Sequence, residues 1–273
     1  MLQLFPQIKK RMMLVCSGYL ALVIILCLLQ PNRNWAVIGL LILLAAQYMN
    51  AVNAHNQLLN RLYNQLDVEG FLRDYEPLLN VPVRSPNLYL MVRLHISNAY
   101  CAQGRFDDAI RLLSSTEVRQ AKPEQMLVTR FALASNLCYC AEQQDDIETA
   151  KTYLEQLRSY KKQLDDIQAQ KPEKKRMVFN TELNEQCMKF LTTGKADIDV
   201  LKTQVQQNNT QQLHRITTSL WIARADLAAN NRREAESILN QIIKLSPDLY
   251  PGKVAKKLLD ELPPKPEEKE EKK

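Results

Sequence analysis

The chain opens on two long apolar runs that are separated by one short polar turn. Met12 to Gln30 carries no charged residue, Trp35 to Val52 is again uncharged, and Pro31 to Asn34 interrupts them. A helix that crosses a bilayer needs about 20 mainly apolar residues, with a usable range of roughly 17–25. Unpaired backbone groups are costly in lipid, so the turn is expected at a membrane surface. The pattern predicts a two-helix transmembrane hairpin over residues 12–52, with spans at 12–30 and 35–52.

Two other interpretations of these runs are a signal peptide and a buried hairpin. A signal peptide has an apolar core of about 7–15 residues and a small-residue cleavage site. The first run is longer than that, ends in Leu-Leu-Gln-Pro, and is followed at once by a second run. Soluble cores rarely extend this far without a charge, which disfavours the buried hairpin.

The basic residues around the runs predict an orientation. Lys9, Lys10 and Arg11 precede the first run, while the turn holds only Arg33. Basic residues in short flanks are retained in the cytoplasm. We therefore expect residues 1–11 to form a basic cytoplasmic N-terminus. The expected localisation is a multi-pass cell-membrane protein with two spans and both termini cytoplasmic.

Beyond residue 52 the apolar positions recur at helical spacing. The whole chain has only 6 glycines, and helix-forming residues dominate its composition. We expect this part to be all-α, as a helical-repeat domain over residues 53–262. The predicted helical pairs span residues 53–80, 90–116, 131–160, 176–208 and 216–247, and a capping helix follows at 251–262. Residues 263–273 contain only Pro, Lys and Glu and are predicted to be a disordered charged tail.

The clearest pair covers residues 90–116. Small residues at Ser97 and Ala109 allow two helices to approach, Tyr100 and Phe106 fill the space beside them, and Gly104 marks the turn. This arrangement resembles a tetratricopeptide repeat (TPR), a two-helix unit of 34 residues.

The resemblance has departures. Arg93 stands where a Trp is typical. The units also recur at roughly 40–45 residues, which exceeds the strict period. The resemblance implies a TPR-like α-solenoid of helical hairpins.

The charge and the motifs exclude several classes of function. The formal net charge is +6, but four of the basic residues and no acidic ones lie in residues 1–52, so no nucleic-acid-binding surface is expected.

The six cysteines lack metal-ligand spacing. The three histidines, His55, His95 and His214, are far apart in the sequence and have no acidic partners at helical spacing. No phosphate-binding, dinucleotide-binding or hydrolase motif occurs. We expect no enzyme activity, no cofactor and no metal.

The TPR resemblance implies that first-helix residues line a concave face that holds an extended peptide or a partner helix. The residues at those positions are His95, Asn98, Asn136, Trp221 and Arg224. Trp and Arg often dominate interface energetics, although Trp221 could instead pack between units. One subgroup of the family clamps a carboxylate with basic residues near such an Asn. Leu94 and Ala102 occupy those positions here, so that specificity is not expected.

The densest basic cluster beyond the runs is Lys171, Lys174, Lys175 and Arg176. It is either a solvated linker around Pro172 or a contact to anionic lipid headgroups, where each basic residue contributes about 1 kcal/mol.

The leading functional hypothesis is a membrane-anchored scaffold or adaptor that binds an unidentified protein partner at the cytoplasmic face. The alternative is a subunit of a membrane complex, or a homo-oligomer, assembled through the hairpin and regulated by the solenoid. Gly18 and Gly39 offer small surfaces for such helix pairing.

Overall fold

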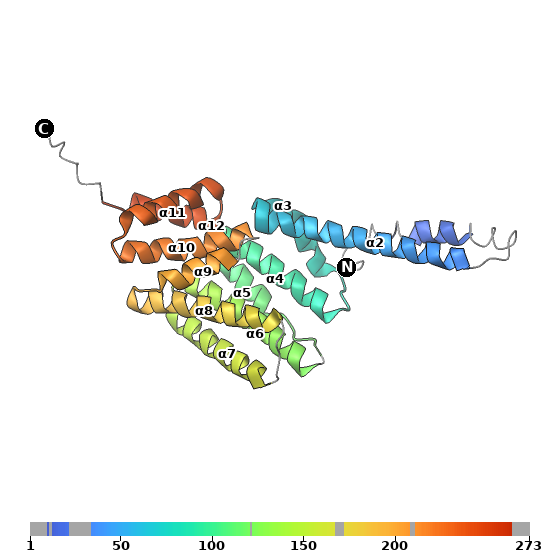
Figure 1. Ribbon diagram of the computed structural model, residues 1–273, viewed down its shortest axis with the longest axis horizontal. Coiled ribbons are helices and arrows are strands. Elements are labelled where there is room, and N and C mark those ends of the chain that lie inside the picture. The colour runs from blue at the N-terminus through green and yellow to red at the C-terminus, as the bar shows by residue number, and fades with distance from the viewer. Residues whose placement is uncertain are drawn as a thin grey trace.

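The protein is built from helices that pair with their neighbours along the chain. The structure is a computed structural model, and it describes residue 10 and residues 13–21, 34–120, 122–166, 172–207 and 211–263. Every regular element in those ranges is helical, and no strand is formed (Figure 1). The elements are α2 (Asn34–Asn60), a π-helical turn η1 (Arg61–Gln65), α3 (Val68–Tyr75), a 3-10 turn η2 (Glu76–Asn80), α4 (Pro86–Gln103), α5 (Phe106–Ser114), α6 (Pro123–Gln143), α7 (Ile147–Asp166), α8 (Pro172–Thr193), α9 (Ile198–Gln207), α10 (Gln212–Ala228), α11 (Arg232–Leu245) and α12 (Tyr250–Asp260).

Local sequence signals set the ends of α4. The Ser85 side chain accepts a hydrogen bond from the backbone N–H of Leu88 at 3.5 Å, and Pro86 occupies the first helical position. The helix ends at Gly104, which adopts a left-handed conformation with φ of 80°. Glycine takes this conformation without the strain that a Cβ causes. The chain can therefore reverse into α5 within two residues.

The two helices of each pair bury their facing sides against each other. In the pair of α6 and α7, Ala150, Leu154 and Leu157 lie against Phe131 and Cys138, and all five side chains are buried. Small Ala150 lets the helices approach, and the larger side chains fill the space on either side. Apolar positions three and four residues apart thus form one contacting face of α7.

The array of pairs closes on itself, because its first and last parts touch. The Tyr63 ring of η1 stacks on His214 of α10, with ring centroids 5.4 Å apart. The side-chain oxygen of Asn64 also accepts a hydrogen bond from the Gln212 backbone N–H at 3.4 Å. At the far end of the chain, α12 contacts α4. In an open solenoid each unit contacts only its neighbours. The closing contacts instead frame a cavity inside the array.

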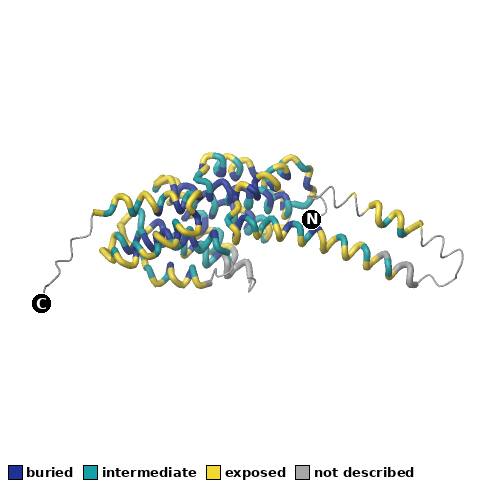
Figure 2. Tube along the Cα trace, turned by 90° about the horizontal axis from the view of Figure 1, so that it is seen from above, coloured by how far each residue is buried: buried dark blue, intermediate teal, exposed yellow. Residues whose placement is uncertain are grey.

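Helix α2 projects from the array and exposes much of its surface (Figures 1 and 2). Residues spaced by four along α2 share a less exposed face. Gly39, Leu43 and Gln47 on this face are half-buried, and Ala51 and His55, nearer the array, are buried. Residues 13–21 are helical and lie beside the projecting part of α2 (Figure 1). The approach is close at Gly39, where an added Cβ would meet the Tyr19 hydroxyl.

The prediction of a transmembrane hairpin at residues 12–52 is corrected by the structure. Among the described residues, no helix combines the length and the apolar character that a membrane span requires. The span predicted to end at Val52 is part of α2, which continues to Asn60. That continuation is rich in Asn and Gln, and Ala51 and His55 are buried by protein contacts. The predicted two-span cell-membrane localisation with cytoplasmic termini is therefore wrong.

The TPR-like solenoid is confirmed only in its coarser form, as an all-α array of helical pairs. The turns of the pairs lie where the sequence indicated, but the closing contacts of η1 with α10 and of α12 with α4 are not those of an open repeat array. Residues 22–33, which include the end of the first predicted span, and residues 264–273 of the predicted tail lie outside the described residues. So do residues 1–9 and 11–12.

Candidate functional site

A cavity lies inside the closed array. Its volume is about 690 Å³, and its walls come from α2 with η1, α4, α6, α8 and α10. Ligand-binding cavities in proteins usually measure roughly 300–1,000 Å³. The cavity therefore has the size of a binding site, and it lies where the closing contacts bring sequence-distant helices together.

Asparagine side chains dominate the polar part of the wall. They come from several helices, and the lining set is Asn56, Asn60, Asn64, Asn98, Asn136, Asn180 and Asn184. Residues four apart share one face of a helix, which explains why three of them follow one another from α2 into η1 and two lie on α8. Apolar and aromatic side chains, among them Phe131, Phe179 and Leu94, fill the wall between the amides.

Besides Asn64, whose oxygen faces the Gln212 backbone N–H, three amides on α4, α6 and α8 have a defined orientation. The Nδ2 of Asn136 donates to the backbone oxygen of Ala132 at 2.8 Å, and the Nδ2 of Asn184 donates to that of Asn180 at 2.8 Å. A backbone carbonyl only accepts hydrogen bonds, so the amide nitrogen must face it. The Nδ2 of Asn98 donates to the Tyr63 hydroxyl at 2.8 Å. No donor within the described residues bonds to the Oδ1 of these three asparagines.

Tyr63 joins two of the walls through its hydroxyl group. Its oxygen accepts a hydrogen bond from the Nδ2 of Asn98 and lies 2.7 Å, within hydrogen-bond distance, from the Nδ1 of His95. Burial raises the pKa of Tyr63 to about 12. The hydroxyl stays protonated at neutral pH and fixes the side chains of α4 relative to η1.

All three histidines of the chain meet beside this tyrosine. The ring centroids of His55 and His95 are 6.2 Å apart, and His214 stacks on Tyr63. Burial lowers the pKa of His95 to about 3 and that of His214 to about 4, and burial also lowers the pKa of His55. The rings are thus neutral at pH 7. In the described ranges, no group of His, Cys, Asp and Glu side chains is arranged to hold a metal ion.

Four of the five residues predicted for a partner-binding groove line this cavity, namely His95, Asn98, Asn136 and Trp221. Trp221 is largely covered, with 3% of its surface exposed, and its ring meets the edge of Phe190 with centroids 5.9 Å apart. Arg224 is not among the lining residues; its guanidinium lies 4.7 Å from the centre of the Trp221 ring. Whether any of these residues binds a partner stays a prediction.

Several lining residues could not be predicted from the sequence. Tyr63 and Glu142 are separated from His95 by 32 and 47 positions, and only the closed array brings them together. Asn180 and Asn184 were detectable, because the spacing of four places two amides on one helix face. Asn56, Asn60 and Asn64 also recur every four residues, so the sequence placed these amides on one face as well.

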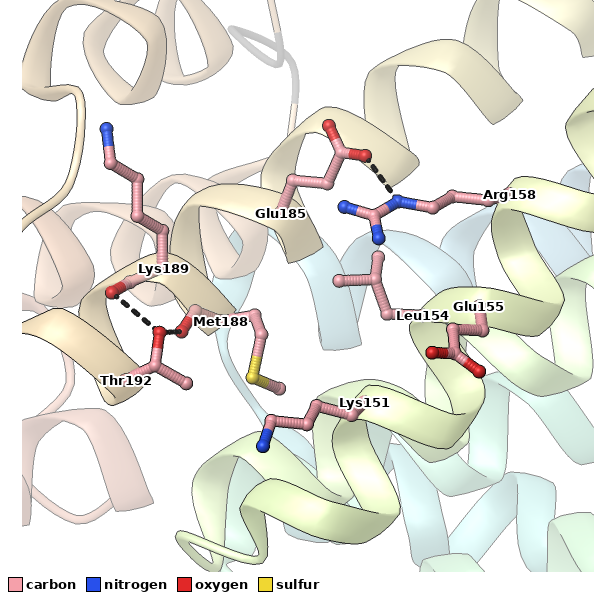
Figure 3. A pocket seen from close by; sticks show the side chains of 8 residues that line it. All are labelled: Lys151, Leu154, Glu155, Arg158, Glu185, Met188, Lys189 and Thr192. Atoms are coloured by element: carbon pink, nitrogen blue, oxygen red, sulfur yellow. Dashed lines mark hydrogen bonds and ion pairs between the residues drawn. The ribbon is translucent and has the colours of Figure 1, made fainter.

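A smaller hollow of about 310 Å³ lies between α7 and α8 (Figure 3). Some of its polar groups are already paired: Arg158 pairs with Glu185 at 2.9 Å, and the Thr192 hydroxyl donates to the Met188 backbone oxygen at 2.9 Å. Basic and acidic side chains alternate across it. Because its charges are of both signs and some are already paired, this hollow is a weaker candidate binding site than the central cavity.

The structure does not describe the side chains of the cluster predicted to contact lipid headgroups. Lys171 lies outside the described residues, and Lys174, Lys175 and Arg176 are placed only by their backbone, in the first turns of α8.

Comparison with known proteins gives little further guidance. No protein-family model and no curated protein matches the chain. One similar solved structure is the crystal structure of BtubC (BKLC) from P. vanneervenii, at 15% identity over 94% of each chain and a TM-score of 0.38. A likeness at that TM-score carries no argument about fold or function.

Proposed function

We propose that the protein is an interaction protein whose central cavity binds an extended peptide segment of a protein partner. The observation that carries this proposal is the row of oriented amides on α4, α6 and α8. Asn98, Asn136 and Asn184 each use one N–H inside the protein and leave a carbonyl oxygen and a second N–H for a ligand.

A peptide backbone is the chemical complement of such amides. Every residue except proline carries one N–H donor and one C=O acceptor, and burying either without a partner is costly. The cavity can pair both groups of a peptide unit, because its Asn side chains donate and accept hydrogen bonds. Phe131, Phe179 and Leu94 on its wall can contact the apolar side chains of the peptide. A peptide whose backbone amides alternate with apolar side chains would contact both the asparagines and the apolar residues of the wall.

Selection from a randomised displayed peptide library, with the whole chain as bait, tests the proposal. Enriched peptides are synthesised and their affinities measured by fluorescence anisotropy. Asn136→Leu keeps the approximate volume and removes the amide, so we expect binding to weaken about 2- to 10-fold, the loss of one hydrogen bond.

Asn240→Leu is the matched control for this experiment. The Nδ2 of Asn240 donates to the Glu236 backbone oxygen at 2.7 Å, the same bond as in Asn136, but it lies on α11 away from the cavity. Enrichment of no peptide at all, or equal affinities for the Asn136→Leu and Asn240→Leu variants, would exclude the cavity as the peptide site.

A second candidate function is self-association through α2, which we propose because its projecting part exposes a continuous apolar stripe. The large side chains of this stripe are Ile38, Leu41, Ile42, Tyr48 and Met49, of which Leu41 and Ile42 are exposed by 60% and 62%. Tyr48 and Met49 follow Leu41 and Ile42 by seven residues, the repeat of a coiled-coil seam. Two copies present identical stripes, and α2 carries no charge that would repel a second copy.

A further inference from the structure

The wall of the central cavity carries almost no formal charge. Among its described lining residues there is no Lys, Arg or Asp, and Glu142 is the single acid. Leu94 and Ala102, which face the cavity from α4, are apolar. In a chain with 24% charged residues, such a wall is strongly depleted of charge.

Glu142 does not supply a negative charge at neutral pH. It is completely buried, and burial raises its pKa well above the ordinary value. One carboxyl oxygen lies 3.5 Å from the Cys138 thiol, and the other has no hydrogen-bond partner among the described groups. A carboxylate in this position would be desolvated without a cation, which is far more costly than a neutral carboxyl group.

The histidines of the wall do not supply a positive charge either. Burial lowers the pKa of His95 to about 3, and its Nδ1 lies 2.7 Å from the uncharged Tyr63 hydroxyl. Burial lowers the pKa of His214 to about 4, and the Tyr63 ring stacks on it. Both are therefore neutral acceptors or donors on the cavity wall at pH 7.

We propose that the cavity selects uncharged ligand segments and excludes Lys, Arg, Asp and Glu side chains from the positions that it encloses. This inference rests on the proposed function, and it names the chemical class of peptide that the site takes. An enclosed ion loses its hydration, and no opposite charge on the wall compensates for that loss. A peptide amide or a Gln or Asn side chain loses less, because the oriented asparagines replace the water that it gives up.

The test is a substitution scan of a peptide that binds the whole wild-type chain. Positions at which alanine weakens binding about tenfold or more are taken as enclosed. Each such position is then replaced by two nearly isosteric pairs, Glu with Gln and Lys with Met. We expect both charged residues to bind at least about 20-fold more weakly than their neutral partners, which corresponds to about 1.8 kcal/mol.

A variant of the protein provides the converse measurement. Leu94→Glu introduces a partly exposed carboxylate on the wall, and it should raise the affinity of the Lys-bearing peptide relative to the Met-bearing one. If charged and neutral peptides bind the wild-type chain equally, the charge selection is wrong while peptide binding stands. If the library yields no binding peptide, the proposed function fails and this inference fails with it.

Discussion

At the scale of single residues, Tyr63 shows how one buried hydroxyl group holds several elements together. Its hydroxyl accepts a hydrogen bond from Asn98 and bonds to Nδ1 of His95, and its ring stacks on His214, so η1, α4 and α10 meet at this side chain. Tyr63 is 5% exposed, and water cannot readily replace a lost partner. The position should therefore be sensitive to the loss of a single oxygen atom.

We predict that Tyr63→Phe lowers the free energy of unfolding by about 1–3 kcal/mol, because two half-buried polar groups, His95 and Asn98, lose a partner. Urea denaturation followed by circular dichroism measures this change. Tyr48→Phe is the control, since Tyr48 is 52% exposed on α2, and it should change stability by less than about 0.5 kcal/mol. Equal effects of the two substitutions would contradict the bridging role.

Glu142 gives a prediction about pH. Its pKa in the folded protein is raised by burial above the ordinary 4.5, so the folded state holds a proton that the unfolded chain releases. The contribution of Glu142 to the free energy of unfolding is therefore fully present below pH 4.5. It is lost as the pH rises toward the pKa that Glu142 has in the folded protein. Glu142→Gln keeps the shape and cannot ionise.

We therefore expect the stability of the Glu142→Gln variant, relative to wild type, to increase between pH 5 and pH 8. Urea unfolding at both pH values measures this. Glu155→Gln alters an exposed carboxyl group on α7 and should give no such increase. Parallel pH profiles of wild type and Glu142→Gln would show that Glu142 ionises freely in the folded protein.

At the scale of elements, the left-handed glycine at the end of α4 fixes where the chain turns. Gly104 has a φ of 80°, and an added Cβ would lie 2.9 Å from Cδ2 of Tyr250 in α12. Gly194 after α8 has a φ of 68°, with no atom within 4 Å of an added Cβ. The two positions share the backbone conformation and differ in the neighbouring helix.

We predict that Gly194→Ala costs about 1 kcal/mol, the strain of a left-handed alanine, and that Gly104→Ala costs about 1 kcal/mol more. The difference between the two variants, measured by urea denaturation, isolates the contact between α4 and α12. If both variants lose the same stability, the Tyr250 side chain moves aside freely and α12 is not closely packed at this point.

The exposed stripe of α2 is also an element-scale feature, and it predicts an oligomer. Leu41→Glu or Ile42→Glu places a carboxylate in the stripe, so paired copies would bring like charges together. Sedimentation velocity should show the wild-type chain as an oligomer and these variants as monomers. Gln57→Glu adds the same charge at an exposed position nearer the array and should leave the oligomer intact. A wild-type chain that sediments as a monomer would refute self-association.

Helical pairs were predictable from the sequence because their signals are local. Apolar spacing, the Ser85-Pro86 start and the Gly104 turn all lie within a few residues of the element that they define. Local signals could not show whether α2 spans a membrane or packs against the rest of the protein. Its uncharged run resembles a membrane span, yet Ala51 and His55 near its end are buried, and His55 lies against Tyr75 and His95, 20 and 40 positions further along the chain.

The candidate site was predictable only in part, for the same physical reason. Asn98 and Asn136 could be assigned to a concave face because each lies on the first helix of a recognisable pair. The amide row and the cluster of His55, His95 and His214 depend on how pairs close against one another. No periodic pattern in the sequence encodes that closure.

At the scale of the whole molecule, closure couples the two halves of the array through neutral histidines. His95 on α4 and His214 on α10 both lie against Tyr63 of η1, beside Tyr75 and His55. Protonating either ring would bury a positive charge, and no acidic side chain is among these neighbours. The closed array should therefore require that the rings remain neutral.

We predict that the wild-type protein loses stability as the pH falls from about 6.5 toward 4. The pKa of His95 is about 3 and that of His214 is about 4 in the folded state, whereas the unfolded chain takes up both protons near 6.5. The free energy of unfolding should fall by about 1.4 kcal/mol per pH unit for each histidine in that window. Urea unfolding at intervals of one pH unit between 7.5 and about 4.5 measures the slope.

His214→Phe tests this assignment, because phenylalanine keeps the ring that stacks on Tyr63 and removes the titrating nitrogen. The slope of its stability with pH should be smaller than that of wild type by one proton, about 1.4 kcal/mol per pH unit. Tyr63→Phe lowers stability without removing a group that titrates in this range, and it should retain the wild-type slope. Glu142 is present in all three proteins, so its opposite dependence on pH cancels in the comparison. A His214→Phe slope equal to that of wild type would show that His214 protonates in the folded protein, and closure would then not depend on its neutrality.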